Sequence, residues 1–174
     1  MNEKQLVSKA KTGDKESFCQ LYGLYKDRLY RYAYYRLGNT ADAEDAVSDT
    51  IVSAYEQISS LKKSGAFCSW IFKILYANCS KYIKLQIQLK EAVNIEDLEN
   101  SVCFSQSMSN ENSELKQALD ILSNEEKELV LLSVAAGLNS SEIAGLTGLK
   151  AGSVRSKLSR SLAKMRGFLG DSYE

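Results

Sequence analysis

The last part of the sequence carries side chains that are suited to reading DNA. Residues 150–166 include six basic residues and no acidic one. Four side chains there follow the spacing i, i+1, i+4, i+5, which gathers them on one face of a helix; they are Arg155, Ser156, Ser159 and Arg160. Arginine can pair bidentately with guanine in the major groove, and serine can reach bases or phosphates. We expect Lys157 and Lys164 to contact phosphates instead.

The residues around this basic face predict a helix-turn-helix that would position it. Asn139 and Glu142 have the spacing of a helix-capping box, and Gly148 follows at the place of a tight turn. Val154 and Leu158 are spaced i, i+4 and would pack the second helix against the first. The alternative is an ordinary solvated basic face on a terminal helix. The cap, the turn and the acid-free second helix together favour DNA binding.

A second basic block, residues 57–90, contains six lysines and no acidic residue. Aromatic residues lie between the lysines, and Trp70 has the helical spacing of a core residue. Lysines beside aromatic rings suit melted or single-stranded DNA, because bases stack on exposed rings while the cations follow the backbone. We expect Trp70 to be mostly core, and Lys73, Tyr76 and the 61–66 loop to offer the contacts.

An acidic segment lies between the two basic blocks, and the formal net charge of the whole chain is zero. Residues 91–128 hold ten acidic residues against two lysines. Within this segment, residues 91–112 lose the hydrophobic periodicity and are rich in Ser and Asn, which predicts a flexible acidic linker. Two basic blocks on either side of such a linker indicate a protein with two separate DNA contacts.

The chain is predicted to be all-α, because it has no proline and no sustained alternation of apolar residues. The first of two small helical domains would span residues 1–90. It should contain an amphipathic helix that ends at Gly38, and a second helix capped by Asn39 with acidic residues in its first turn. A loop at 59–65 and a third long helix should follow.

The second domain would span residues 113–174. We expect a short helix at 113–122 and then a helix that starts with a capping box at Ser123 and is closed by Gly137. The helix-turn-helix follows, and its last helix should run from about residue 152 to 168.

Enzyme chemistry has little support in the sequence. Without histidine no Ser-His or Cys-His pair is possible, and no Gly-rich phosphate loop is present. The acidic residues Asp42, Glu44, Asp45 and Asp49 could suggest a metal-dependent nuclease, but anions belong at a helix start in any case. The four cysteines form no Cys-x-x-Cys pair, so buried thiols in a reducing cytosol explain them better than a metal site. We expect no catalytic residue, no metal and no cofactor.

Membrane insertion is not expected either. The sequence has no apolar run of about 18 residues, which a membrane span needs, and its first residues lack the apolar core of a signal peptide. These features predict a cytoplasmic protein.

Three stretches of this sequence resemble bacterial sigma factors of the extracytoplasmic-function (ECF, group IV) type. They are residues 13–58, 67–84 and 118–166, in the order of the family and at its usual length. The most specific parts are the motif DAEDAVSDTIVSAY, residues 42–55, and the helix-turn-helix at 138–160.

The resemblance implies a role for each part. Residues 42–58 look like the helix that binds the β′ coiled coil of core RNA polymerase, with contacts at Asp45, Ser48, Asp49 and Ile51. Residues 61–84 look like the segment that opens DNA and captures the minus-10 element, with contacts at Lys62, Lys63, Lys73, Tyr76, Asn78 and Lys81. The last helix resembles the reader of the minus-35 element, with contacts at Arg155, Ser156, Lys157, Ser159, Arg160 and Lys164.

The resemblance also implies partners: core RNA polymerase through its β′ coiled coil and β flap, promoter DNA, and an anti-sigma factor that is often membrane-bound. The sequence departs from the family in its third helix. The family often has Asn seven residues after the tryptophan, where this chain has Ala77, and Asn78 follows. Ser48 stands where Gln is common.

Two other functions remain open at this point. The chain could be a stand-alone helix-turn-helix regulator whose N-terminal half dimerises, in which case it would bind a two-fold DNA site unaided. It could also be an anti-sigma-like adaptor with no DNA role, in which case Arg155 and Arg160 could be changed without consequence.

Overall fold

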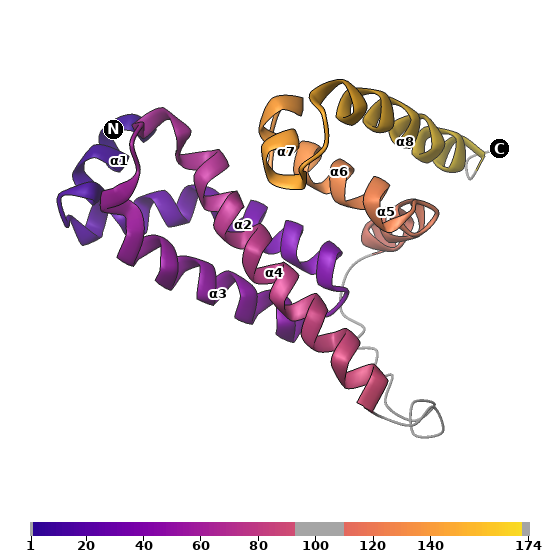
Figure 1. Ribbon diagram of the computed structural model, residues 1–174, viewed down its shortest axis with the longest axis horizontal. Coiled ribbons are helices and arrows are strands. Elements are labelled where there is room, and N and C mark those ends of the chain that lie inside the picture. Colours follow the sequence, from indigo (N-terminus) through magenta and orange to yellow (C-terminus); the bar gives the residue numbers. More distant parts are fainter. Residues whose placement is uncertain (1, 93–109, 172–174) are drawn as a thin grey trace.

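The computed structural model describes residues 2–92 and 110–171, which are helical apart from short connections (Figure 1). The N-terminal helical group consists of α1 (Glu3–Lys11), α2 (Lys15–Leu37), α3 (Thr40–Gln57), two 3-10 turns (Ile58–Ser60 and Ser64–Ala66) and α4 (Phe67–Ala92). The C-terminal helical group consists of α5 (Asn110–Asp120), α6 (Asn124–Val134), α7 (Ser140–Thr147) and α8 (Ala151–Asp171). The predicted all-α fold with two helical units is confirmed.

The predicted linker is shorter at both ends than its sequence suggested. Helix α4 continues through Ala92, and α5 already begins at Asn110. The rest of the predicted linker, residues 93–109, lies outside the described residues. Residues 91–92 and 110–112 are polar apart from Ala92, so hydrophobic periodicity could not show that the helices extend over them.

The predicted helix boundaries follow from local capping. Asn39 accepts a hydrogen bond from the Asp42 amide at the start of α3, and Gly38 closes α2 with a φ of 81°. Both predicted capping boxes, at Ser123 and at Asn139, are present. Helix α1 is an addition to the predicted elements. It has a capping box of its own at Asn2, and the Tyr25 hydroxyl on α2 donates to Glu3 at 2.9 Å.

The N-terminal core forms where α2, α3 and α4 pack together over α1. Its largest fully buried side chains include Tyr32, Phe67, Ile71, Phe72 and Leu75. Tyr32 and Phe72 meet edge to face, with ring centroids 5.9 Å apart. Trp70 is half-buried beside this core. The packing fixes α4 along α3, which in turn places the 61–66 turn at one end of the group.

The C-terminal core joins α6, α7 and α8. Leu129, Leu132, Ile143 and Val154 are fully buried there. Gly148 ends α7 with a φ of 75°, a left-handed conformation that glycine adopts without steric cost. The turn therefore brings α8 back across α7, as a helix-turn-helix requires.

The cysteine thiols were predicted to be buried, and this holds for only some of them. Cys79 is buried, and burial raises the pKa of its thiol to about 12. Cys68 is half-buried, whereas Cys19 is exposed on the surface of α2. Cys103 lies outside the described residues. Among the described helices, none combines the length and the low charge that a membrane span requires.

The two helical groups lie against each other. Helix α6 packs on α2, and α7 approaches α4 (Figure 1). The surfaces predicted to meet DNA and polymerase are therefore placed by the packing between the groups as well as by the packing within each one.

Candidate nucleic-acid and polymerase interfaces

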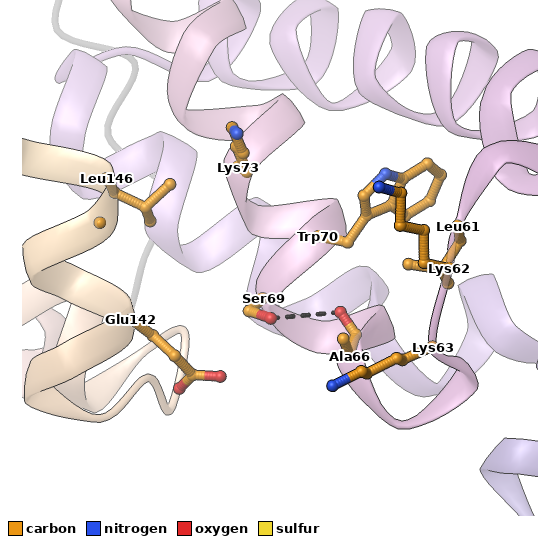
Figure 2. A pocket seen from close by; sticks show the side chains of 10 residues that line it. Leu61, Lys62, Lys63, Ala66, Ser69, Trp70, Lys73, Glu142 and Leu146 are labelled. Atoms are coloured by element: carbon orange, nitrogen blue, oxygen red, sulfur yellow. Dashed lines mark hydrogen bonds between the residues drawn. The ribbon is translucent and has the colours of Figure 1, made fainter.

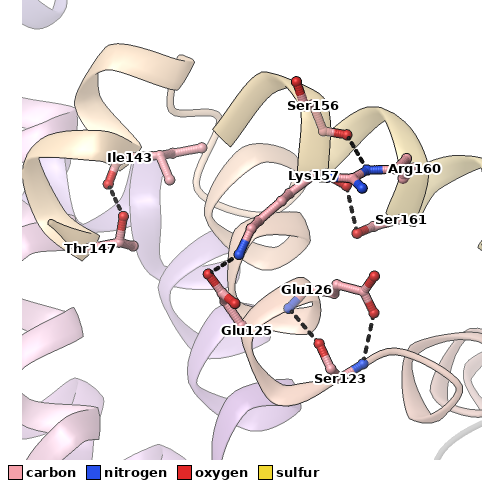
Figure 3. A network of polar contacts seen from close by, with 9 residues as sticks. All are labelled: Ser123, Glu125, Glu126, Ile143, Thr147, Ser156, Lys157, Arg160 and Ser161. Carbon is pink, nitrogen blue, oxygen red and sulfur yellow. Dashed lines mark hydrogen bonds and ion pairs between the residues drawn. The ribbon is translucent and has the colours of Figure 1, made fainter. Parts of the chain in front are cut away.

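The predicted base-reading face of α8 lies at the surface. Its four side chains, Arg155, Ser156, Ser159 and Arg160, are all exposed. Val154 and Leu158 on the opposite side of α8 are buried against α6 and α7, which fixes the rotation of the helix. The Arg160 Nε donates to the Ser156 carbonyl at 3.2 Å and holds that side chain along the helix (Figure 3). A helix held by one face with basic and polar groups on the other can enter a major groove.

Lys157 and Lys164, which we expect to contact phosphates, form surface ion pairs with α6 in this structure. The Lys157 Nζ lies 2.5 Å from the Glu125 carboxylate (Figure 3). The Lys164 Nζ lies 2.6 Å from the Glu126 carboxylate. A phosphate would have to compete with these carboxylates for both amines. The pKa of Glu126 is lowered to about 2, chiefly by the hydrogen bond from Lys164 and also by that from the Ser123 amide.

Three of the lysines predicted to meet the minus-10 element gather around one cavity. Lys62, Lys63 and Lys73 line it together with Trp70, and their side chains are exposed. Figure 2 shows the 61–66 turn and the first turns of α4 forming one wall, while the other wall belongs to α7. This arrangement combines cations with an aromatic ring, as binding of single-stranded DNA requires.

Asn78 is a correction to the predicted DNA contacts. It is only 5% exposed, and its amide donates to the Thr50 Oγ1 of α3 at 3.0 Å. Its carbonyl oxygen accepts a hydrogen bond from Lys81 at 3.3 Å. The reason is helical register, since Asn78 falls on the same stripe of α4 as Ile71 and Leu75. Asn78 therefore joins α4 to α3, and Ala77 occupies the exposed position beside it.

Tyr76 is less available to a base than was expected. It is half-buried, and the guanidinium of Arg36 from α2 lies 4.3 Å from the centre of its ring. The same guanidinium donates to the Tyr76 carbonyl at 2.8 Å. One face of this ring is thus already covered by a cation. Lys81 is exposed and lies one turn of helix further along α4.

The predicted polymerase-binding face of α3 is exposed along most of its length. Asp45, Ser48 and Asp49 all lie at the surface. Ile51 instead turns toward α2 and is half-buried in an apolar groove with Phe18. Sequence reasoning missed the two residues that continue the exposed face, which are Val52 at 58% and Tyr55 at 42% exposure. Exposed apolar side chains at helical spacing from the carboxylates were the available signal.

The acidic residues Asp42 and Asp49 of α3 accept hydrogen bonds from different partners. Asp42 accepts hydrogen bonds from Asn39 and from Gln86 of α4. Asp49 accepts a hydrogen bond from the Tyr82 hydroxyl at 3.0 Å, and burial together with this bond raises the pKa of Tyr82 to about 12. These contacts tie the start and middle of α3 to α4, which argues for a structural and surface role rather than nuclease chemistry.

Two protein-family models match this sequence. The family model Sigma-70 region 2 matches residues 21–86, and Sigma-70 region 4 matches residues 112–165. Together they cover more than half of the chain and correspond to the two helical groups.

Individual relatives agree with these models. The chain is 30% identical over 173 residues to the ECF RNA polymerase sigma factor BldN of Streptomyces coelicolor, a match that covers 96% of this chain. The chain spans 66% of the length of BldN.

Two solved structures share the fold. CnrH, in complex with the cytosolic domain of CnrY, has a TM-score of 0.71 at 22% identity and covers 97% of both chains. RpoE of Bartonella quintana, in complex with the anti-sigma factor NepR, has a TM-score of 0.69 at 24% identity, over 89% of this chain and 98% of that chain. The chain therefore belongs to the ECF sigma factors of the sigma-70 family.

Proposed function

We propose that this protein binds core RNA polymerase and directs promoter-specific initiation of transcription, for an alternative stress or envelope regulon. The observation that carries the proposal is the separation of two exposed basic surfaces onto two helical groups, with an exposed acidic face on a third surface. Polymerase would do the chemistry, so the protein itself is a non-enzymatic factor without a cofactor. Its action on core RNA polymerase would place it in the cytoplasm.

Each surface has a proposed partner. The outer face of α8, with Arg155 and Arg160 at its centre, reads the minus-35 element, because exposed arginines on a helix-turn-helix can pair with guanine. The lysines around the 61–66 turn, with Lys73 and Lys81, follow the backbone of the melted minus-10 strand.

Core polymerase is proposed to bind mainly through α3. Asp45, Ser48 and Asp49 present carboxylates and a hydroxyl to the β′ coiled coil, and the exposed Val52 adds apolar area beside them. The C-terminal helical group would bind the β flap. Ile51 contributes less directly, because it is half-buried against α2.

An anti-sigma factor, possibly membrane-bound, is the proposed inhibitory partner. Support comes from the fold, because the similar chain RpoE was solved bound to the anti-sigma factor NepR. The apolar groove formed by Phe18, Tyr22 and Tyr55 lies next to the polymerase-binding face and would suit such a partner.

The test is transcription from genomic DNA of the host. The purified protein is mixed with core RNA polymerase and fragmented genomic DNA, and transcript starts are mapped. Discrete start sites that require this protein are expected. The absence of transcripts, together with specific binding of the protein alone to a two-fold DNA site, would contradict the proposal and favour a stand-alone regulator.

A further inference from the structure

The cavity between the 61–66 turn and α7 has the size of a small-molecule site. One wall is formed by the turn and the start of α4, and the other wall belongs to α7 (Figure 2). Its volume of about 450 Å³ lies in the range of ligand pockets, about 300–1,000 Å³. Four of its lining residues are apolar: Leu61, Ala66, Trp70 and Leu146. The cavity can therefore enclose a small organic molecule, and the charged groups around it decide which class of molecule fits.

Three lysines around this cavity have no carboxylate within ion-pair distance. Lys62, Lys63 and Lys73 are exposed, and none of them takes part in the ion pairs of the described residues. The first turn of α4, which forms part of the same wall, carries no acidic residue to offset the positive end of the helix dipole. This concentration of positive charge favours a ligand that carries several negative charges.

Trp70 adds a flat aromatic surface to the same wall. Its indole is half-buried and packs on Phe67, with the ring centroids 5.8 Å apart, while the rest of the side chain lines the cavity. Leu146 points toward the cavity from α7 on the opposite side (Figure 2). A planar base can stack on such a ring, because every base has a π-face. The cavity thus offers an apolar, aromatic part beside a cationic part.

Glu142 sets the direction in which an anionic ligand can lie. It is the acidic residue among those that line the cavity, and its carboxylate faces the wall of Lys63 (Figure 2). The carboxylate is held in the capping box of α7, where it accepts a hydrogen bond from the Asn139 amide at 2.9 Å. A phosphate close to α7 would be repelled by it. The phosphates of a ligand therefore belong on the lysine side, and an uncharged base belongs between Trp70 and α7.

We propose that this cavity binds a free nucleoside di- or triphosphate, with the base against Trp70 and the phosphates on Lys62, Lys63 and Lys73. A nucleoside diphosphate carries a charge of about −3 at neutral pH, which three lysines match. A ligand with a single negative charge, such as a fatty acid, would leave most of the lysine charge unpaired. The site lies within the protein alone, so it does not depend on the proposed role in transcription.

The first test titrates the full chain with adenosine 5′-diphosphate (ADP) in the absence of divalent cations. Calorimetry should give one site, and stacking of the base should quench the emission of Trp70, the single tryptophan of the chain. Adenosine and pyrophosphate should each bind at least about tenfold more weakly, because each lacks one of the two recognised parts. Pyrophosphate that binds as tightly as ADP, or a titration with neither heat nor quenching, would overturn the proposal.

The second test asks whether the lysines at the cavity are specific. Lys63→Gln and Lys73→Gln should each weaken ADP binding about tenfold, the effect of losing one charge-assisted hydrogen bond. Lys84→Gln makes the same charge change at an exposed position of α4 outside the cavity and should leave the affinity unchanged. Equal weakening in all three variants would indicate general attraction of an anion and would overturn the site.

The third test asks whether the ligand lies between the two walls. Glu142→Gln keeps the capping box, since glutamine can make the same hydrogen bond, but it removes the negative charge that faces the lysines. ADP should then bind about threefold more tightly. Glu125→Gln, at an exposed position of α6 away from the cavity, is the matched control and should not change the affinity. An unchanged affinity in Glu142→Gln would place the anion outside the cavity and overturn the proposal.

Discussion

At the scale of single residues, the basic side chains of α8 fall into two classes that the sequence does not separate. Arg155 and Arg160 point away from the domain, whereas Lys157 and Lys164 pair with Glu125 and Glu126 of α6. All four are basic residues on one helix, so composition treats them alike. Only the two arginines are free of carboxylate partners in the described ion pairs, and they are the better candidates for base recognition.

Arg155→Ala and Arg160→Ala should each cost about 1–3 kcal/mol of promoter binding and relax sequence choice in the upstream element. The reason is the loss of a bidentate arginine contact to a base. Binding of the polymerase complex to a library of promoter variants measures both effects. Arg166→Ala, at an exposed position nearer the end of α8, is the matched control and should weaken binding without changing the choice of sequence. Unchanged choice in the first two variants would count against base reading by this face.

The Glu126 carboxylate makes the C-terminal group sensitive to acid. Its folded-state pKa of about 2 lies below the ordinary value of 4.5, so its contribution to stability is complete above pH 4.5 and is lost as the pH falls toward 2. Wild type should be more stable than Glu126→Gln at neutral pH, and the difference should disappear on acidification. Thermal unfolding followed by circular dichroism against pH measures it. A gap that stays constant down to pH 2 would contradict the assignment.

At the scale of elements, the helical register of α4 decides which of its residues are exposed and could contact DNA as proposed. Ile71, Leu75 and Asn78 share the stripe that faces the core, while Lys73 and Ala77 share the outer side. A polar residue on a core stripe is satisfied by a partner from a neighbouring helix, and Thr50 of α3 provides it. The resemblance to the family pointed to this region, but the helical period assigns Asn78 to structure.

Asn78→Ala should therefore destabilise the N-terminal group by about 1–3 kcal/mol, because a hydrogen bond between α3 and α4 is lost at a buried site. Urea unfolding measures the change. Ala77→Ser, at the exposed neighbouring position, should remain within about 0.5 kcal/mol of wild type. Normal stability of Asn78→Ala combined with a specific loss of promoter opening would restore the DNA contact that the burial argues against.

At the scale of the whole molecule, the proposed function requires the α3 face, the 61–66 turn and α8 to act together on one polymerase. The two DNA surfaces lie on separate helical groups, and the α3 face carries Asp45, Ser48 and Asp49 at the surface of the N-terminal group. The contact between α2 and α6 currently holds the groups together.

Asp45→Lys should abolish stable binding to core polymerase, because it reverses the charge at the centre of the proposed contact. Pull-down of core polymerase with the tagged variant measures the loss. Glu44→Lys, an equal charge change on the neighbouring exposed position of α3, is the control and should retain binding. Normal recovery of polymerase with Asp45→Lys would remove α3 from the proposed interface.

The sequence by itself determined the helices from α2 onward and their approximate ends, whereas α1 was not predicted. Caps at Asn39, Ser123 and Asn139, and turns at Gly38 and Gly148, act through hydrogen bonds within a few residues, so their pattern is readable along the chain. The same holds for the exposed face of α8, because Val154 and Leu158 define the opposite side by their spacing.

Only the tertiary structure decided which polar side chains are available to partners. The burial of Asn78, the covering of the Tyr76 ring by Arg36 and the capture of Lys157 by Glu125 all join residues from different helices. The docking of Glu128 onto Tyr32 and Arg36 joins different helical groups. Such contacts depend on how helices pack in space, and hydrophobic periodicity specifies which face of a helix is buried but not which polar group it will meet.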